Sequence, residues 1–381
     1  MANFYSALGL MSGTSMDGVD VSIIESDGNR EYLSILDRYF EYDDELIKKL
    51  LKIRDKITSF NKLKLYKEEI TILEREVTLF QARAVIETIE SSKSKVDLIG
   101  FHGQTIFHDP ENKITKQLGD GKLLSQLTKK KVVYDFRQND LKNGGQGAPL
   151  TPIFHNAMAN KISKKFGLKF PIDILNIGGI ANITTTVYEG DLWDTKNLSA
   201  YDIGPGNCLI DEWMRKNSKK KYDKEGLLAK SGRVDELILN QALDNFNLNS
   251  NYQKSLDIKD FDIFFAKGLS LENGVATITD FTAKLIADGI NYIHNKNNSN
   301  INTCLVCGGG RKNKYLLDRI KNNCKKLNIN PVDEYEVNGD FVESQAFAYL
   351  AIRLLEGMPI SFPTTTRCKI PSLGGVIIEN F

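Results

Sequence analysis

Several common sequence signals are missing from this chain, and each absence excludes a class of protein. No run of about 18 apolar residues exists, so we expect no membrane span. Residues Met1 to Tyr5 lack a basic region followed by an apolar core, so we expect no signal peptide. The 50 Lys and Arg residues are balanced by 49 Asp and Glu residues, which argues against a dedicated nucleic-acid binder.

Metal-binding and disulfide patterns are also scarce. The five cysteines are odd in number and scattered, which fits reduced thiols in a cytosol better than a disulfide scaffold. Cys304 and Cys307 form a lone CxxC inside an apolar run, and a buried strand explains them better than zinc. His102 and His108 lie six residues apart without a third ligand at a usual spacing, so we expect no metal there.

The size and composition that remain are those of an ordinary globular protein with two domains. The chain has 381 residues, of which 41% are hydrophobic and 26% are charged. This length is too great for one small domain and fits two.

One stretch near the N-terminus, Ala7 to Glu25, carries the first functional signal. It predicts a strand, a glycine-rich turn over Ser12 to Gly18, and a second strand. Backbone N–H groups and hydroxyls in such a turn bind phosphate oxygens, and Asp17 and Asp20 add carboxylates that suit Mg²⁺. The stretch is not a Walker A loop, because Gly-Lys-Ser/Thr and a following helix are absent. An ordinary hairpin turn remains the alternative.

A similar pattern recurs near the middle of the chain. A strand over Ile172 to Ile177 is followed by a turn over 178–182 and a strand over 183–187. Two such hairpins could hold the two ends of a polyphosphate. Asp202 follows, just before Gly-Pro-Gly, where a carboxylate could act as a general base or simply start a turn. Asn207 is a candidate N-cap for a helix over 208–216.

Other polar or glycine-rich segments follow predicted strands. A strand over 96–101 leads into His102 and Gln104, whose donor and acceptor groups suit a sugar hydroxyl. A strand over 131–136 leads to Arg137, either a carboxylate or phosphate clamp or a surface ion pair. Residues 143–149 contain three glycines and a proline, which suits a hinge or a backbone that approaches a ligand closely. Gly308 to Gly310, after a strand over 303–307, leave room for an adenine or ribose, or form a tight turn.

Eight motifs together make the chain resemble a known family. They are LMSGTSMDGVD (10–20), FHGQT (101–105), DFRQND (135–140), GGQGAPL (144–150), LNIGGIAN (175–182), YDIGPGN (201–207), CGGG (307–310) and ESQAFA (343–348). In this order they resemble the anhydro-N-acetylmuramic acid kinases, sugar kinases of the actin/hexokinase/Hsp70-like ATPase superfamily. The resemblance implies an α/β fold of two ribonuclease H-like lobes, with mixed sheets, glycine-tipped phosphate hairpins and a cleft between the lobes. We expect lobes at 1–145 and 146–356, with 357–381 as a segment that could return to the first.

The resemblance also implies roles for individual residues, with ATP and Mg²⁺ as cofactors. Asp202 matches the catalytic base, and Asp17 is the expected Mg²⁺ contact, directly or through water. The expected ATP contacts are Gly13, Thr14, Ser15, Met16, Asp17, Gly18, Val19, Asp20, Gly178, Gly179, Gly308, Gly309 and Gly310. The expected sugar contacts are His102, Gln104, Arg137 and Glu343.

Family members open the 1,6-anhydro ring of anhydro-N-acetylmuramic acid with water and phosphorylate O6, giving N-acetylmuramic acid 6-phosphate and ADP. The resemblance therefore implies a cytoplasmic homodimer that acts in peptidoglycan recycling and amino-sugar catabolism. One stretch departs from the family pattern: Lys254 to Lys259 reads KSLDIK where many members read KSTGRE. The missing Arg leaves Arg137 and Lys259 as substitutes near the lactyl carboxylate. Two alternatives stay open, another anhydro sugar such as levoglucosan, or a non-catalytic nucleotide or sugar sensor.

Overall fold

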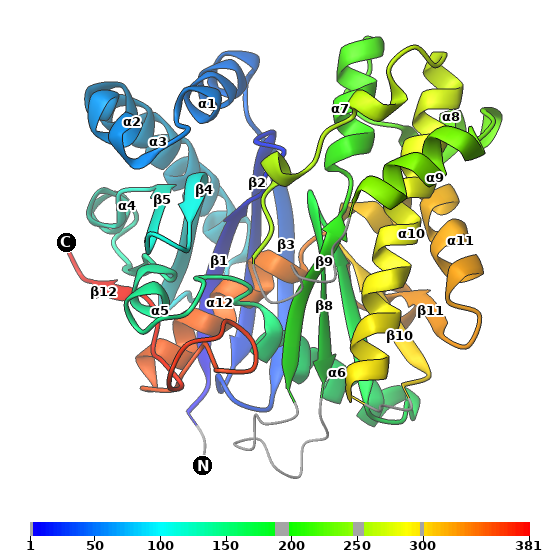
Figure 1. Ribbon diagram of the computed structural model, residues 1–381. Coiled ribbons are helices and arrows are strands. Elements are labelled where there is room, and N and C mark those ends of the chain that lie inside the picture. Colours follow the sequence, from blue (N-terminus) through cyan, green and yellow to red (C-terminus); the bar gives the residue numbers. More distant parts are fainter. Residues whose placement is uncertain (1–2, 187–197, 247–254, 298–300) are drawn as a thin grey trace. The chain divides into compact units, whose positions relative to one another are not determined.

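The computed structural model describes residues 3–186, 198–246, 255–297 and 301–381, which divide into two compact units. Unit 1 contains Met1–Lys161 and Phe341–Phe381, and unit 2 contains Ile162–Asp340 (Figure 1). The chain passes from one unit to the other after Lys161 and after Asp340, whereas the expected boundaries followed residues 145 and 356. The C-terminal return to unit 1 begins earlier, because the helix at 342–355 packs on the strands of unit 1.

Unit 1 is built on a mixed seven-stranded sheet with the order β12-β6-β4-β1-β2-β3, in which β5 also pairs with β4. Strands β1, β4 and β6 are parallel neighbours, and the remaining pairs are antiparallel. The strands are β1 (Tyr5–Ser12), β2 (Gly18–Ser26), β3 (Tyr32–Glu41), β4 (Leu98–Asp109), β5 (Ile114–Leu118), β6 (Lys131–Tyr134) and β12 (Val376–Ile378). The helices are α1 (Asp44–Lys56), α2 (Phe60–Leu65), α3 (Lys67–Ser92), α4 (Gly121–Thr128), α5 (Gln138–Lys142), the first part of α6 (Pro152–Phe166) and α12 (Val342–Leu355).

Helix α12 packs directly on the middle of this sheet, against β1, β2 and β4 (Figure 1, orange). Two glycines make the close approach possible. A Cβ on Gly9 of β1 would lie 1.9 Å from the Ser344 carbonyl oxygen, and one on Gly100 of β4 would lie 2.1 Å from that of Phe347. A larger residue at either position would push the helix off the sheet.

Unit 2 is built on a mixed five-stranded sheet with the order β11-β10-β7-β8-β9. Its strands are β7 (Ile172–Ile177), β8 (Ile180–Thr186), β9 (Ser199–Pro205), β10 (Thr303–Cys307) and β11 (Asn328–Pro331). Its helices are α7 (Cys208–Asn217), α8 (Leu227–Ser231), α9 (Glu236–Asn245), α10 (Leu271–Asn297) and α11 (Lys314–Asn323). Short 3-10 turns include η4 (Ile258–Asp260), η6 (Gly309–Lys312) and η7 (Val332–Tyr335). The long helix α10 packs on β9 and on α7, α8, α9 and α11.

The predicted α/β class, with two mixed sheets, is confirmed, and so are the two glycine-tipped hairpins, β1–β2 and β7–β8. The CxxC lies in the buried strand β10, as predicted, with both thiols free. In the described ranges, no group of three or more His, Cys, Asp or Glu side chains could hold a metal. No described helix is long and apolar enough to cross a membrane.

Several predicted element bounds were wrong. The spacing of apolar residues from Ile70 to Ala84 predicts one helix over about 62–91, but the structure has two, α2 and α3, broken at Tyr66. Strand β4 does not end at Phe101 but continues to Asp109, because its second half pairs with β5. Strand β6 ends at Tyr134, since Asp135 takes a φ of 58° that leaves the extended region. Strand β8 already begins at Ile180, and Val187 lies outside the described residues.

The glycine-rich stretch over 143–149 lies inside unit 1, whereas the sequence suggested a hinge. The carboxylate of Asp140 accepts hydrogen bonds from the Gly147 N–H at 2.7 Å and the Thr366 hydroxyl at 2.6 Å. The Gln146 N–H donates to the Thr366 carbonyl at 2.8 Å. These bonds fix the stretch against the C-terminal segment of the same unit.

Candidate functional site

In unit 1, the candidate site begins at the turn between β1 and β2. Thr14 and Ser15 are exposed at its tip, whereas Met16 is buried and takes a φ of 56°. The Met16 N–H donates to the Gly13 carbonyl at 3.2 Å, which closes the turn. The buried Met16 side chain therefore anchors a loop whose tip stays open to solvent.

A chain of buried side chains holds the base of this hairpin. The Gln81 amide donates to the Tyr42 hydroxyl at 2.6 Å, and the Ser12 hydroxyl donates to the Gly18 carbonyl at 2.5 Å. The Tyr42 and Ser12 hydroxyls lie 2.9 Å apart, so Tyr42 donates to Ser12. Burial raises the pKa of Tyr42 to about 12, which keeps its hydroxyl protonated as a donor. The Tyr42 N–H also donates to the Asp17 carbonyl at 2.8 Å.

Gln104 is the predicted sugar contact that the structure places beside the hairpin. It lies opposite Ser12 in the β1–β4 pair, and its amide nitrogen donates to the Gly13 carbonyl at 2.9 Å. Its Oε1 is buried and accepts no hydrogen bond from any described group. Gln104 therefore positions the hairpin with one end and offers a vacant acceptor with the other.

Asp17, the predicted Mg²⁺ contact, is half-buried at the end of the same turn. Its Oδ1 accepts a hydrogen bond from the Ser15 hydroxyl at 2.6 Å. One carboxylate beside one hydroxyl is the kind of oxygen-donor set that Mg²⁺ uses together with several waters.

His102 and Arg137, predicted separately, lie in direct contact. The Arg137 guanidinium donates to His102 Nε2 from Nε at 3.2 Å and from Nη2 at 2.9 Å. His102 Nδ1 therefore carries the proton and donates to the Gly103 carbonyl at 2.8 Å. Burial and, secondarily, the Arg137 charge hold the pKa of His102 well below its usual value, so the ring is neutral. Arg137 also donates to the Gly147 carbonyl at 2.8 Å.

Glu343 lies in the first turn of α12, on the same face as Phe347 one turn later. The Phe347 ring packs against the His102 ring with 4.5 Å between centroids. Glu343 therefore lies on the face of α12 from which Phe347 contacts His102.

In unit 2, the second hairpin is joined by Gly178 and Gly179 alone. The Gly206 N–H donates to the Gly179 carbonyl at 2.9 Å, and the Asn207 N–H donates to the Gly178 carbonyl at 2.8 Å. These bonds tie the hairpin to the start of α7. Asn207 occupies the N-cap position, but its side chain makes no capping bond among the described residues, so that prediction was wrong.

Asp202, the predicted base, is buried in β9 opposite Asn182 of β8. The pairing shifts register at this point because β9 carries one extra residue, and such bulges re-aim side chains. Asp202 Oδ2 accepts hydrogen bonds from the Leu256 N–H at 2.8 Å and the Ser255 hydroxyl at 3.2 Å. The stretch that departs from the family pattern therefore contacts Asp202, while its Lys254 lies outside the described residues.

The predicted adenosine loop begins at Gly308, whose φ of 79° favours glycine. Arg311, which the sequence analysis missed, is buried beneath this loop and donates to the Gly308 carbonyl at 3.1 Å. Its guanidinium also pairs with Asp333 at 2.6 Å and with Asp340 at 2.7 Å. The local sequence Arg-Lys-Asn is typical of a surface segment and did not indicate a buried Arg. The carboxylates that pair with Arg311 lie more than 20 residues later in the chain.

At three glycines of the candidate site, neither the sign of φ nor the room for a Cβ atom requires glycine. A Cβ on Gly13, Gly178 or Gly309 would meet no described atom closer than 3.9, 3.7 and 3.9 Å, respectively. None of the three takes a positive φ. Each belongs to one of the three predicted nucleotide loops, so the space above each backbone fits a ligand that approaches closely.

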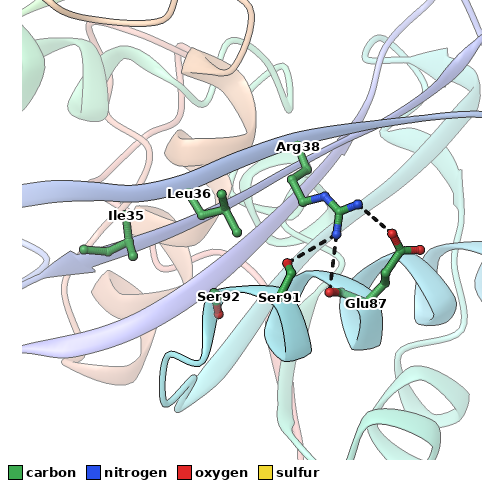
Figure 2. A pocket seen from close by; sticks show the side chains of 6 residues that line it. All are labelled: Ile35, Leu36, Arg38, Glu87, Ser91 and Ser92. Atoms are coloured by element: carbon green, nitrogen blue, oxygen red, sulfur yellow. Dashed lines mark hydrogen bonds and ion pairs between the residues drawn. The ribbon is translucent and has the colours of Figure 1, made fainter.

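A surface pocket of about 640 Å³ in unit 1 involves other residues (Figure 2). It lies between β3 and the end of α3 and is lined by Ile35, Leu36, Arg38, Glu87, Ser91 and Ser92. Figure 2 shows Arg38 turned to Glu87, which it contacts at 2.6 Å, and to Ser91 at 3.3 Å. None of the predicted site residues lines this pocket.

Comparison with known proteins gives full-length matches. The family model described as anhydro-N-acetylmuramic acid kinase matches residues 5–380. A protein of that name from Pelagibacter ubique (strain HTCC1062) is 51% identical over 385 residues, covering 100% of both chains. Another from Rhizorhabdus wittichii is 38% identical over 375 residues, covering 97% of this chain and 98% of the relative.

Solved structures match at much lower identity. One is the activator of the 2-hydroxyisocaproyl-CoA dehydratase from Clostridium difficile with bound ADPNP, with a TM-score of 0.43 and 9% identity, covering 92% of this chain and 96% of the other. Another is a ROK family glucokinase from Streptomyces griseus in complex with glucose and AMPPNP, with a TM-score of 0.38 and 12% identity, covering 91% and 98%.

Proposed function

The chain belongs to the anhydro-N-acetylmuramic acid kinase family and is a kinase, and from this premise we propose its reaction. It opens the 1,6-anhydro ring of anhydro-N-acetylmuramic acid with water and transfers the γ-phosphoryl group of ATP to O6. The products are N-acetylmuramic acid 6-phosphate and ADP. We place this step in cell-wall recycling and amino-sugar catabolism.

Use of ATP is supported above all by the three glycines without a structural role. Gly13 and Gly178 lie at the tips of the two hairpins, where backbone N–H groups suit phosphate oxygens. Gly309 lies in the loop expected to border the adenosine. Because an added methyl group would meet the protein only at ordinary van der Waals distance at each position, alanine there would interfere chiefly with a bound ligand.

Mg²⁺ would be held by Asp17, directly or through water, with Ser15 beside it. When bound, the ion would offset the negative charge of the phosphates, which is a large part of what phosphoryl transfer requires. The short Ser15–Asp17 bond fixes the carboxylate that would receive it.

Asp202 would take a proton from the water that attacks C1 of the sugar, as the base of an inverting glycosidase does. The bond between C1 and O6 breaks, and O6 attacks the γ-phosphorus. Hydrogen bonds from Leu256 and Ser255 to one carboxylate oxygen fix the orientation of Asp202. The burial of Asp202 keeps it in a site where few bulk waters compete.

The sugar would be bound by groups of unit 1 that are already oriented. The neutral His102 holds the Arg137 guanidinium, which is suited to the lactyl carboxylate of the substrate. The vacant Oε1 of Gln104 can accept a hydrogen bond from a sugar hydroxyl. Glu343 is a further candidate on the adjacent face of α12.

The test is ADP release in the presence of the anhydro sugar, for the wild type and two variants. Asp202→Asn should keep ATP binding and lose turnover by about 10³-fold or more, since it removes the base. Gly178→Ala should keep the melting temperature and raise the KM for ATP at least tenfold. Binding of ATP and sugar without ADP release would favour the sensor alternative. Normal turnover of Asp202→Asn would remove that residue from the mechanism.

A related substrate is the second candidate, because residues 256–259 depart from the family pattern and begin at Leu256, whose N–H donates to Asp202. The ratio of kcat/KM for anhydro-N-acetylmuramic acid and for levoglucosan decides between them. The cytoplasmic location and the homodimeric state implied by the resemblance stay predictions, which cell fractionation and light scattering would test.

A further inference from the structure

A row of polar side chains crosses the sheet of unit 2 at the position of Asp202. Cys307 of β10 pairs with Asn176 of β7, Asn176 pairs with Asn182 of β8, and Asn182 pairs with Asp202 of β9. Directly opposed residues in a ladder project from the same face of the sheet. The neighbours of these residues along each strand, such as Ile177 and Ile183, belong to the apolar core. The row is therefore a continuous line of polar side chains with apolar neighbours along each strand, separate from the buried Asp173–Thr185 pair of the same sheet.

Asn182 is the member of this row whose side-chain oxygen lacks a hydrogen-bond donor among the described residues. Its Oδ1 is buried, and no group in the described part of the chain donates a hydrogen bond to it. The Asn176 Oδ1, by contrast, lies 3.7 Å from the Cys307 thiol, and Asp202 Oδ2 has two donors. A buried acceptor without a partner destabilises the folded protein, so such a group points to a partner that arrives from outside.

We propose that Asn182 is a positioning residue for the water that Asp202 activates, an assignment that rests on the proposed function. Side chains of directly opposed strand residues start about 5 Å apart, which leaves room for one water between an amide and a carboxylate. One proton of that water goes to Asp202 as its oxygen bonds to C1 and the C1–O6 bond breaks. The other O–H remains intact and donates to Asn182 Oδ1. Two fixed acceptors orient the attacking lone pair toward C1, whereas one would leave the water free to rotate.

This role predicts opposite effects on stability and on rate. Asn182→Leu has the same number of side-chain heavy atoms and removes an acceptor that nothing in the folded chain satisfies. It should therefore leave the melting temperature unchanged or raise it. Turnover should fall, because loss of water orientation costs up to about 10²-fold. A structural asparagine would instead show a lower melting temperature and near-normal turnover.

The experiment compares Asn182→Leu and Asn182→Asp with Ile183→Val, a control on the opposite face of the same strand. We expect Asn182→Leu to lower kcat about 30- to 100-fold with the KM for ATP within twofold. Asn182→Asp, which keeps an acceptor, should recover part of that loss, and the control should stay within twofold of wild type. If Asn182→Leu does not fold, Asn182→Ala takes its place: a kcat loss greater than its loss of folded fraction supports the assignment, and a kcat loss equal to that fraction overturns it.

Two results would overturn the assignment, and they are distinguishable from failure of the proposed function. A kcat within twofold of wild type in Asn182→Leu, or a kcat loss matched by a lower melting temperature, would remove Asn182 from the mechanism while the kinase stands. A wild-type protein that releases no ADP with any 1,6-anhydro sugar would remove the proposed function and this assignment together.

Discussion

The two glycine hairpins look alike in sequence but are held in different ways. The first is held by backbone bonds and also by side chains, with Tyr42 and Ser12 at its base and Gln104 at the Gly13 carbonyl. The second is held by backbone, through N–H groups of Gly206 and Asn207. We call the hydrogen bonds that hold a hairpin its clasp. The side-chain bonds of the first clasp can be removed one at a time by substitution. The backbone bonds of the second clasp can be broken only by a change in the path of the chain.

The steric surroundings of the second hairpin explain why its clasp needs no side chains. A Cβ on Gly206 would lie 2.2 Å from the Gly178 carbonyl oxygen and 3.2 Å from that of Gly179. Only a residue without a side chain lets the two backbone segments lie in direct contact. The clasp and the glycine are therefore one feature.

Of the changes that test how the two hairpins are held, Gly206→Ala should have the largest effect. The added methyl group must displace the Gly178 carbonyl and break the backbone clasp, which we expect to cost about 3 kcal/mol, at the upper end of overpacking. Turnover should fall at least 10²-fold, because the hairpin and the start of α7 move apart. Urea unfolding and the rate of ADP release measure the two effects.

Gly178→Ala is the matched control, because the added Cβ has no described atom closer than 3.7 Å. It should keep wild-type stability while it weakens ATP binding. Equal stabilities for the two alanine variants would contradict the steric account of the clasp.

Three buried histidines of unit 1 predict that acid lowers the stability of the protein. Burial lowers the pKa of His108 to about 4 and that of His155 to about 3, and it lowers that of His102 together with the Arg137 charge. An unfolded histidine has a pKa of about 6.5. Below a pH of about 6.5 the unfolded chain binds protons that these buried histidines do not bind in the folded chain. The free energy of unfolding is therefore undiminished above that pH and decreases as the pH falls.

At pH 5, His108 and His155 should each lower the free energy of unfolding by about 2 kcal/mol relative to pH 7.5. Urea unfolding at pH 7.5, 6 and 5 measures the slope, and His155→Gln should make it shallower without touching the candidate site. An unfolding free energy that stays constant from pH 7.5 to 5 would show that these rings are not held neutral.

The elements that could be predicted from the sequence are those that one local pattern of residues determines. The strand–turn–strand pattern around Gly13 and the one around Gly178 predicted both hairpins. The Gly-Pro-Gly sequence drew attention to Asp202, whose role stays a prediction, but the surroundings of its carboxylate were not predictable from spacing. Its donors Ser255 and Leu256 come more than 50 residues later, in a stretch that has no helical or strand periodicity.

The errors arose where tertiary pairing overrode local composition. His102 and Gln104 were expected beyond the end of a strand over 96–101, because polar residues follow the apolar run there. They lie in β4 because β5 returns to pair with that segment, and the left-handed φ of Gly103 accommodates the irregularity. Arg311 and Asn182 were missed for a related reason. The burial of a polar side chain depends on partners from other elements, which single-sequence periodicity does not contain.

Tyr42→Phe should have the smallest of the three effects and is the most direct test of the side-chain clasp. It leaves the Gln81 amide without its acceptor and Ser12 without its donor, at a cost of about 1–2 kcal/mol. The KM for ATP should rise a few-fold, because Ser12 then holds the Gly18 carbonyl less firmly. Tyr39→Phe is the control, since Tyr39 is an exposed residue beside the same hairpin. Hydrogen exchange should quicken at Gly18 and stay unchanged at Gly206; faster exchange at both would mean that the two clasps are not independent.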